Sequence, residues 1–195
     1  MTLEEVRKGI DSVDNQMKEL FRQRMALADN VATVKAQTAD SIFKPEREEL
    51  IIKRVTEDMD ESIVKEYTAF IKRTMEVSRK YQYRRTLELR NCFPFEITSD
   101  ALEESAAFLV LPEHQHLKFS FKCIDKSGTF ATALTMIADY GVNVTDLQVV
   151  SVETEEGKMY ELTVDVEANL LEKEIQAMVF QLSEENKDFA LLSSY

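Results

Sequence analysis

The 195-residue sequence is poor in cysteine and has no long apolar segment. Its two cysteines, Cys92 and Cys123, lack the paired spacing of metal ligands, so we expect free thiols in a reducing compartment rather than a structural disulfide. No run of about 18 apolar residues occurs, and no basic stretch followed by an apolar run opens the chain. These absences predict a soluble, unexported protein of the cytoplasm.

Cations are also scarce, because 24 Lys and Arg stand against 36 Asp and Glu and give a formal net charge of −12. Nucleic acid and anionic membranes demand basic surface, so neither is expected as a main partner. The charges are unevenly distributed: residues 1–90 hold 18 cationic and 17 acidic side chains, whereas residues 91–195 hold 6 and 19. This asymmetry predicts two domains.

Glycine and proline are absent between Ile10 and Phe43, which favours one long helix. Thr2 and Glu5 form a capping box at its start. Apolar residues follow at helical spacing, namely Leu3, Val6, Ile10, Val13, Met17, Leu20, Leu27, Val31 and Val34. Such a helix spans roughly 50 Å at ~1.5 Å per residue. One small domain cannot cover so long an apolar face, so we expect a second copy of the chain to pair along it.

Two more helices are predicted before residue 91. Pro45 suits the first turn of the second helix, and a third is expected from about Ser62 into the Arg84 region. Residues 91–116 contain two of the three prolines and no sustained period, apart from a strand candidate at 108–111, so we interpret them as a connector.

From residue 117 the hydrophobic pattern changes to short alternating segments. Strands are predicted at 118–124, 142–154, 159–166 and 189–192, helices at 129–140 and 170–183, and a turn at 155–158. This βαββαβ order is typical of a ferredoxin-like sandwich, which we assign to residues 117–195.

Arg24 interrupts the apolar face of the first helix, four residues after Leu20 and three before Leu27. A buried guanidinium is costly unless an anion meets it, so Arg24 either forms an ion pair with another helix or binds an anionic ligand. Lys35 lies about 16 Å further along the axis and within about 20° of the same direction. The two side chains can therefore enclose a small anion.

Other polar residues of the three helices are unremarkable one by one. Arg7 lies about 25 Å before Arg24 on another face, so a solvated arginine is the simpler interpretation, although an antiparallel partner chain would bring its own copy near. Glu48 and the adjacent Arg47 lie in the first turn of the second helix, where a carboxylate is favourable. On the third helix, Ser78 and Gln82 are one turn apart and point the same way.

Taken together, seven of these residues resemble in order and spacing the active-site pattern of the all-helical chorismate mutases, namely Arg7, Arg24, Lys35, Arg47, Glu48, Ser78 and Gln82. The resemblance covers roughly residues 3–85 and includes the mutase module of bifunctional chorismate mutase/prephenate dehydratases. It implies an all-α three-helix domain at residues 1–90, an intertwined homodimer, chorismate as substrate, and neither cofactor nor metal. Lys44 departs from the pattern, because this position is often an aspartate near the substrate hydroxyl.

The resemblance also implies a role for each residue. Arg24 and the Arg7 of a second copy would hold the two carboxylates of chorismate. Lys35 and Gln82 would donate to the ether oxygen, and Glu48 would hold the ring hydroxyl. Ser78 and Arg47 would complete the wall of the site.

The second half resembles an ACT domain, the ligand-sensing module of amino-acid metabolism. The matching segments are 125–130 (DKSGTF), 140–143 (YGVN) and 191–195 (LLSSY). The resemblance implies an aromatic amino-acid effector and an effector site that includes Gly128, Thr129, Phe130, Asn143 and Gln148. Residues 148–151 read QVVS, where the version found in prephenate dehydratases carries ESRP.

Two other functions fit parts of this pattern. An isochorismate-pyruvate lyase has the same helical fold and a similar cationic set, but an attached ACT domain favours a mutase under feedback control. A non-catalytic amino-acid sensor would use its helical half only to dimerise, and a pure coiled-coil face would prefer leucine at position 24. The sequence therefore predicts a chorismate mutase of phenylalanine and tyrosine biosynthesis that an aromatic amino acid regulates.

Overall fold

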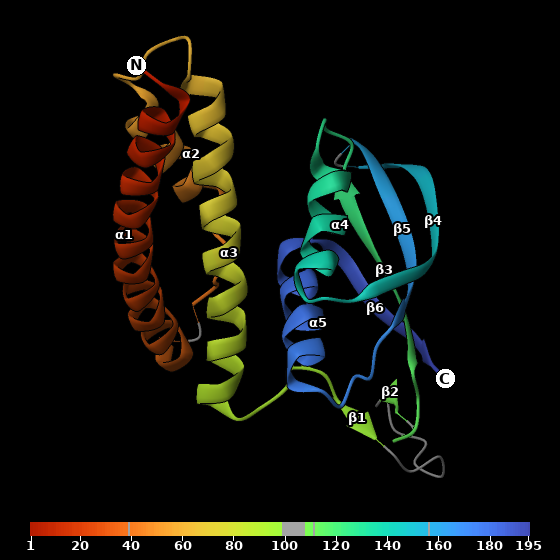
Figure 1. The fold of residues 1–195 in the computed structure, drawn as a ribbon. Coiled ribbons are helices and arrows are strands. Elements are labelled where there is room, and N and C mark those ends of the chain that lie inside the picture. The colour runs from red at the N-terminus through yellow and green to blue at the C-terminus, as the bar shows by residue number, and fades with distance from the viewer. Residues whose placement is uncertain (39, 99–107, 111, 156) are drawn as a thin grey trace.

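The computed structural model describes residues 1–38, 40–98, 108–110, 112–155 and 157–195. Its N-terminal half consists of three helices, α1 (Leu3–Thr38), α2 (Pro45–Thr56) and α3 (Val64–Arg90). Helix α1 runs beside α3, and α2 packs against α3 (Figure 1). The predicted three-helix domain is confirmed.

The ends of these helices follow from local sequence. The backbone N–H of Thr2 donates to Glu5 Oε2 at 2.6 Å and that of Glu5 donates to Thr2 Oγ1 at 3.2 Å, which confirms the capping box. Pro45 opens α2 as predicted. Helix α3 continues past the predicted Arg84 region to Arg90 and ends at Asn91, whose φ of 47° is left-handed. Its backbone N–H caps the helix by donating to the Leu87 carbonyl at 2.8 Å.

Most of the apolar face of α1 is uncovered in a single chain. The buried residues of this helix are Ala28 and Ala32, whereas Leu20 is 63% and Leu27 is 64% exposed. Soluble proteins rarely leave so long an apolar stripe in contact with water. The exposure is what the sequence leads us to expect of a helix that pairs with a second chain.

The connector contains a two-stranded parallel sheet of β1 (Ile97–Thr98) and β2 (Phe108–Leu109). The predicted strand at 108–111 is therefore shorter than expected, and its last residue lies outside the described residues. Phe93 and Phe95 pack against the core of the C-terminal half. The segment that follows α3 is thus attached to that core.

The C-terminal half is an antiparallel four-stranded sheet with two helices. Its elements are β3 (His116–Ile124), α4 (Thr129–Asp139), β4 (Asn143–Thr154), β5 (Gly157–Glu167), α5 (Lys173–Glu185) and β6 (Lys187–Ser194). The strand order β4-β5-β3-β6 confirms the ferredoxin-like βαββαβ fold. Residue 156, in the predicted turn at 155–158, lies outside the described residues.

The core of this half lies between the sheet and its helices. Leu117, Phe119 and Phe121 alternate along β3 and are fully buried, and Met178 and Leu182 of α5 pack with them. Side chains of successive strand residues point to opposite faces, so alternation places these three on the helix side. Helices α4 and α5 lie between the sheet and α3 (Figure 1).

The two halves meet where α3 packs against α5. Tyr83 of α3 is fully buried and meets the ring of Phe180 edge-on, with centroids 5.2 Å apart. Arg73 of α3 forms a bidentate ion pair with Asp139 at the end of α4, at 2.5 and 2.7 Å. Within the described ranges, no helix is both long and apolar enough to cross a membrane.

Candidate active site

Arg24 reaches from α1 across to α3. Its Nη1 donates to the Ser78 hydroxyl and, at 3.3 Å, to the Thr74 carbonyl. Burial lowers the pKa of the guanidinium, and the charge of Glu48 acts in the opposite direction. Among the residues described, no carboxylate lies within ion-pair distance of Arg24. The structural ion pair considered for this arginine is therefore not formed in the single chain, and its charge is available to an anionic ligand.

Lys35 lies near the C-terminal end of α1, where its Nζ donates to the Ile42 carbonyl at 2.8 Å. Burial lowers the pKa of this lysine. Asp40 and Glu48 act against that shift, and Lys44 and Arg47 add to it. Lys35 therefore lies within electrostatic reach of the first turn of α2, which brings α1 and α2 into one site.

Ser78 and Gln82 lie on α3, one turn apart as predicted. Ser78 is 3% exposed, and Gln82 is half-buried with its Nε2 donating to the Ser78 carbonyl at 3.2 Å. The contact between Arg24 and Ser78 places both side chains beside the cationic part of α1. The three helices thus bring together Arg24, Lys35, Glu48, Ser78 and Gln82, with the exposed Arg47 at the margin.

Arg7 stands apart from this group, whereas the charge of Lys44 reaches Lys35. Arg7 is exposed, and it makes no hydrogen bond or ion pair with any part of the chain that the structure describes. It is 17 residues from Arg24 on a continuous helix, so the two are about 25 Å apart along the axis. Lys44 forms an ion pair with Asp40 at 2.7 Å. Arg7 therefore does not join the other site residues of its own chain.

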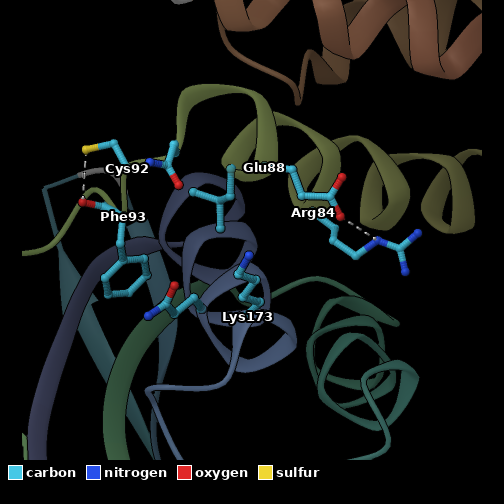
Figure 2. Close-up of a pocket in the computed structure, with 8 residues that line it drawn as sticks. Arg84, Glu88, Cys92, Phe93 and Lys173 are labelled. Atoms are coloured by element: carbon cyan, nitrogen blue, oxygen red, sulfur yellow. Dashed lines mark hydrogen bonds and ion pairs between the residues drawn. The ribbon is translucent and has the colours of Figure 1, made fainter.

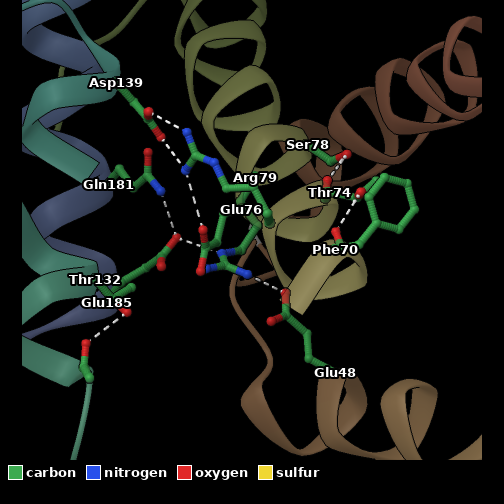
Figure 3. Close-up of polar contacts among 12 residues, drawn as sticks. Glu48, Phe70, Thr74, Glu76, Ser78, Arg79, Thr132, Asp139, Gln181 and Glu185 are labelled. Carbon is green, nitrogen blue, oxygen red and sulfur yellow. Dashed lines mark hydrogen bonds and ion pairs between the residues drawn. The ribbon is translucent and has the colours of Figure 1, made fainter. Parts of the chain in front are cut away.

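Glu48 has a partner that sequence reasoning did not identify. Its Oε1 accepts a hydrogen bond from Nη1 of Arg79, a buried arginine of α3, at 2.5 Å. The sequence does mark Arg79 as unusual, because it lies on an apolar face of α3, four residues after Met75 and four before Tyr83. Arg24 interrupts the apolar face of α1 in the same way. Its second partner, Glu185, belongs to α5 of the C-terminal half (Figure 3).

The residues expected to bind an effector lie at both ends of α4 and along β4. Gly128, with φ 89°, precedes α4, and Thr129 and Phe130 begin the helix. Asn143 begins β4 and donates to Glu167 at 2.8 Å, and Gln148 is exposed on the same edge strand. Helix α4 has 11 residues and is about 16 Å long. One chain therefore does not bring Gly128 and Asn143 to the same small ligand.

A separate hollow lies at the C-terminal end of α3, against α5 (Figure 2). It is lined by Arg84, Leu87, Glu88, Asn91, Cys92, Phe93, Lys173 and Gln176. Cys92 is exposed and free there, and Cys123 is free and buried in the sheet. None of the predicted site residues lines this hollow.

The chain thus combines a cationic site on three helices with a ferredoxin-like domain, and comparison with known proteins gives the family. Residues 6–83 match the model for chorismate mutase type II, and residues 119–179 match that for the ACT domain. A chorismate mutase of Methanocaldococcus jannaschii is 34% identical over 85 residues, which cover 40% of this chain and 86% of that protein. The chain belongs to the type II chorismate mutase family, carries an ACT domain, and is an isomerase.

The chain also resembles a solved structure, the crystal structure of prephenate dehydratase in complex with L-Phe from Arthrobacter aurescens. The TM-score is 0.38 and the identity 17%, over 47% of this chain. This chain spans 29% of the length of that one.

Proposed function

We propose that the chain rearranges chorismate to prephenate and that an aromatic amino acid bound to its ACT domain lowers this activity. The observation that carries the proposal is the convergence of Arg24 and Lys35 with Glu48, Ser78 and Gln82 from three helices. Burial lowers the pKa of both cations, so each gains from an anion beside it. A substrate with two carboxylates suits such a site.

The chemistry asks little of the protein beyond position and charge. Conversion of chorismate to prephenate is an intramolecular [3,3] rearrangement that needs no nucleophile. The site has to hold the compact conformer and stabilise the negative charge that grows on the ether oxygen. A rate gain of ~10⁶ corresponds to ~8 kcal/mol, which several preorganised charge-assisted hydrogen bonds can supply.

The placement of the side chains supports a division of roles. Arg24 binds a carboxylate, with Ser78 holding the guanidinium in place. Lys35 and Gln82 donate to the ether oxygen. Glu48 accepts from the ring hydroxyl, and Arg47 lines the margin. The mutase domain corresponds to residues 1–90, the connector to 91–116 and the ACT domain to 117–195.

The working form is a homodimer with sites shared between chains. Two features support this: the uncovered apolar face of α1 and the separation of Arg7 from the site of its own chain. An antiparallel second α1 would cover the face and bring its own Arg7 to the second carboxylate of the substrate.

A subunit-exchange experiment tests the shared site. Arg7→Ala and Arg24→Ala dimers are each expected to be nearly inactive in a chorismate-disappearance assay. After mixing and exchange, half of the sites in each heterodimer would contain both arginines, so activity should return. The two variants have the same mass, so one of them is labelled with ¹⁵N, and mass spectrometry then shows when mixed dimers have formed. Failure to recover activity in these mixed dimers would refute the shared site. As the control, Arg7→Ala protein alone is taken through the same exchange procedure and should stay inactive.

The regulatory half of the proposal concerns the loop at Gly128. Backbone donors of this loop and the N-terminus of α4 suit the carboxylate of an amino acid, and half-buried Phe130 is near enough to meet a ring. Because Gly128 and Asn143 lie at opposite ends of α4, a complete effector site needs two ACT domains. Such a ligand would favour one arrangement of the dimer.

Calorimetry on the full chain with phenylalanine and then tyrosine tests the binding step. Coupling of this kind is usually ~1 to 3 kcal/mol, or about 5- to 150-fold in affinity, and it is reciprocal. A bicyclic transition-state analogue should therefore weaken amino-acid binding by the factor by which the amino acid weakens the analogue. If neither amino acid binds at millimolar concentration, or if binding leaves activity unchanged, the regulatory proposal fails.

A further inference from the structure

We propose that Arg79 is a positioning residue for the mutase site: it holds the Glu48 carboxylate and is itself anchored by Glu185 of the ACT domain. This inference rests on the proposed function, in which Glu48 contacts the substrate. It adds a direct mechanical link between the ACT domain and the site within one chain, whatever the arrangement of a dimer.

The geometry of the link comes from two different nitrogen atoms of one guanidinium. Arg79 Nη1 donates to Glu48 Oε1 at 2.5 Å, and Arg79 Nε donates to Glu185 Oε1 at 2.9 Å (Figure 3). The guanidinium also lies over the ring of Phe43, 4.7 Å from its centroid. A planar group held on two edges and one face cannot turn toward one carboxylate without moving relative to the other.

Burial shows which end of the link is fixed and which faces a ligand. The side chains of Arg79 and Glu185 are 7% and 4% exposed, whereas that of Glu48 is 25% exposed. Glu185 is thus the buried anchor, and Glu48 is the end open to solvent on the mutase side. A displacement of α5 would be passed to Glu48, because the rigid guanidinium lies between them.

Electrostatic attraction stabilises the ion pairs that Arg79 forms with Glu48 and Glu185. Burial alone would lower the pKa of Arg79, but the two carboxylates outweigh it and the pKa lies above its ordinary value. Burial raises the pKa of the Glu185 carboxyl, and Arg79 opposes that shift. Two carboxylates therefore share one guanidinium. A change in the position of either carboxylate alters the hydrogen bond that the other accepts from Arg79.

The link continues into the ACT domain toward α4. Gln181 Nε2 donates to Glu185 Oε1 at 3.0 Å, and Tyr140 Oη donates to Gln181 Oε1 at 2.9 Å. Tyr140 directly follows α4, and the loop at Gly128 precedes the same helix. An effector that moves α4 therefore changes the surroundings of Glu185, and Arg79 carries this change to Glu48.

A purely structural ion pair would make the same contacts, so the test has to separate stability from position. The decisive variant is Arg79→Leu/Glu185→Leu on the full chain. Replacing both partners of a buried pair by apolar residues is often neutral for stability, and the Glu48 carboxylate that loses this cation is 25% exposed and can be solvated. Thermal unfolding should therefore stay close to wild type. The hold on Glu48 is nevertheless lost, and kcat/KM for chorismate should fall by about 10-fold or more.

A double-mutant cycle with Glu48→Gln shows whether Arg79 acts through Glu48. The Arg79→Leu/Glu185→Leu variant should divide its loss between kcat and KM as Glu48→Gln does. Adding Glu48→Gln to it should cost no more than about 2-fold further. Arg73→Leu is the matched control, because it removes another α3 ion pair with the ACT domain that does not touch Glu48. It should leave kcat/KM within about 2-fold of wild type.

Each outcome decides the inference. Wild-type kcat/KM in the folded double variant, or losses that multiply fully with Glu48→Gln, would show that Arg79 has only a structural role. If the double variant does not fold, Arg79→Lys is used instead, because lysine keeps the positive charge but lacks the planar guanidinium that reaches both carboxylates. This variant should divide its loss between kcat and KM as Glu48→Gln does, and its melting temperature should equal that of the wild type. A fully active Arg79→Lys would then overturn the inference.

Titration with L-phenylalanine and L-tyrosine tests the coupling. An amino acid that inhibits wild type should change kcat/KM of the Arg79→Leu/Glu185→Leu variant by less than about 2-fold, although it still binds. Equal inhibition of both proteins refutes the link. If neither amino acid changes the activity of the wild type, both the proposed regulation and the coupling through Arg79 are refuted. The kcat and KM values of the variants then still decide whether Arg79 positions Glu48. A folded wild-type protein inactive on chorismate marks instead a failure of the proposed function.

Discussion

Leu27 offers a direct test of pairing along α1, because 64% of this residue is exposed in the single chain. Fully burying a leucine contributes about 1.5 to 3 kcal/mol, so a partner that covers the exposed two-thirds gains roughly 1 to 2 kcal/mol from each Leu27. A twofold-symmetric dimer contains this contact twice. Leu27→Ala should therefore weaken the dimer by about 2 to 4 kcal/mol, or about 30- to 1,000-fold in Kd.

Sedimentation velocity over a range of concentrations measures this change. Arg22→Ala is the matched control, since this exposed residue lies on the same helix about 140° around from Leu27. The control should dimerise like the wild type. A wild-type protein that is monomeric at micromolar concentration, or a Leu27→Ala protein with unchanged Kd, would refute the assignment of this face.

Three further predictions concern single side chains. Lys35→Ala and Gln82→Ala should fold normally and lose about 100-fold or more in kcat for chorismate, because each removes a donor to the ether oxygen; wild-type kcat in either would refute its role. Gln82→Glu should be inactive near neutral pH, where a carboxylate cannot donate, and should recover partly as the pH falls towards the ordinary glutamate pKa of about 4.3; a flat pH profile from pH 4 to 8 argues against this. Tyr83→Phe should raise the melting temperature by about 2 to 4 °C, because the buried Tyr83 hydroxyl has no hydrogen-bond partner among the described residues and such a group costs about 1 kcal/mol or more. A lower melting temperature, measured by calorimetry, would mean that the hydroxyl is satisfied.

Local patterns predicted much of the fold. The capping box at Thr2, the proline at position 45 and the alternation along β3 each depend on neighbouring residues only, and the structure has each where it was expected. The contact of Arg24 with Ser78 was not predicted. The interrupted apolar face of α1 indicated an anionic partner, either a carboxylate of another helix or a ligand, and the structure shows a hydroxyl group of α3 instead.

Contacts between the halves were not predictable in this way. Arg79 and Glu185 are 106 positions apart, and their pairing depends on which face of α3 the ACT domain covers. Helical spacing alone marks Arg79 as unusual but does not supply its partner. The extension of α3 to Arg90 was not predicted for the same reason. It depends on a contact between the halves, in which Tyr83 and Leu87 of the last turns pack against Phe180.

The effector residues show another limit. Gly128 and Asn143 were grouped by resemblance, and the linear sequence does not tell whether one chain or two brings them together. The structure separates them by the length of α4. Their convergence therefore stays a prediction about an assembly of two chains.

The central claim is tested most directly by following chorismate disappearance with the purified full chain while phenylalanine and then tyrosine are titrated in. We predict that chorismate is consumed without added metal or cofactor, that prephenate accumulates in equal amount, and that one of the two amino acids lowers the rate. A folded, dimeric protein that leaves chorismate unchanged, or that instead releases pyruvate from isochorismate, would contradict the account.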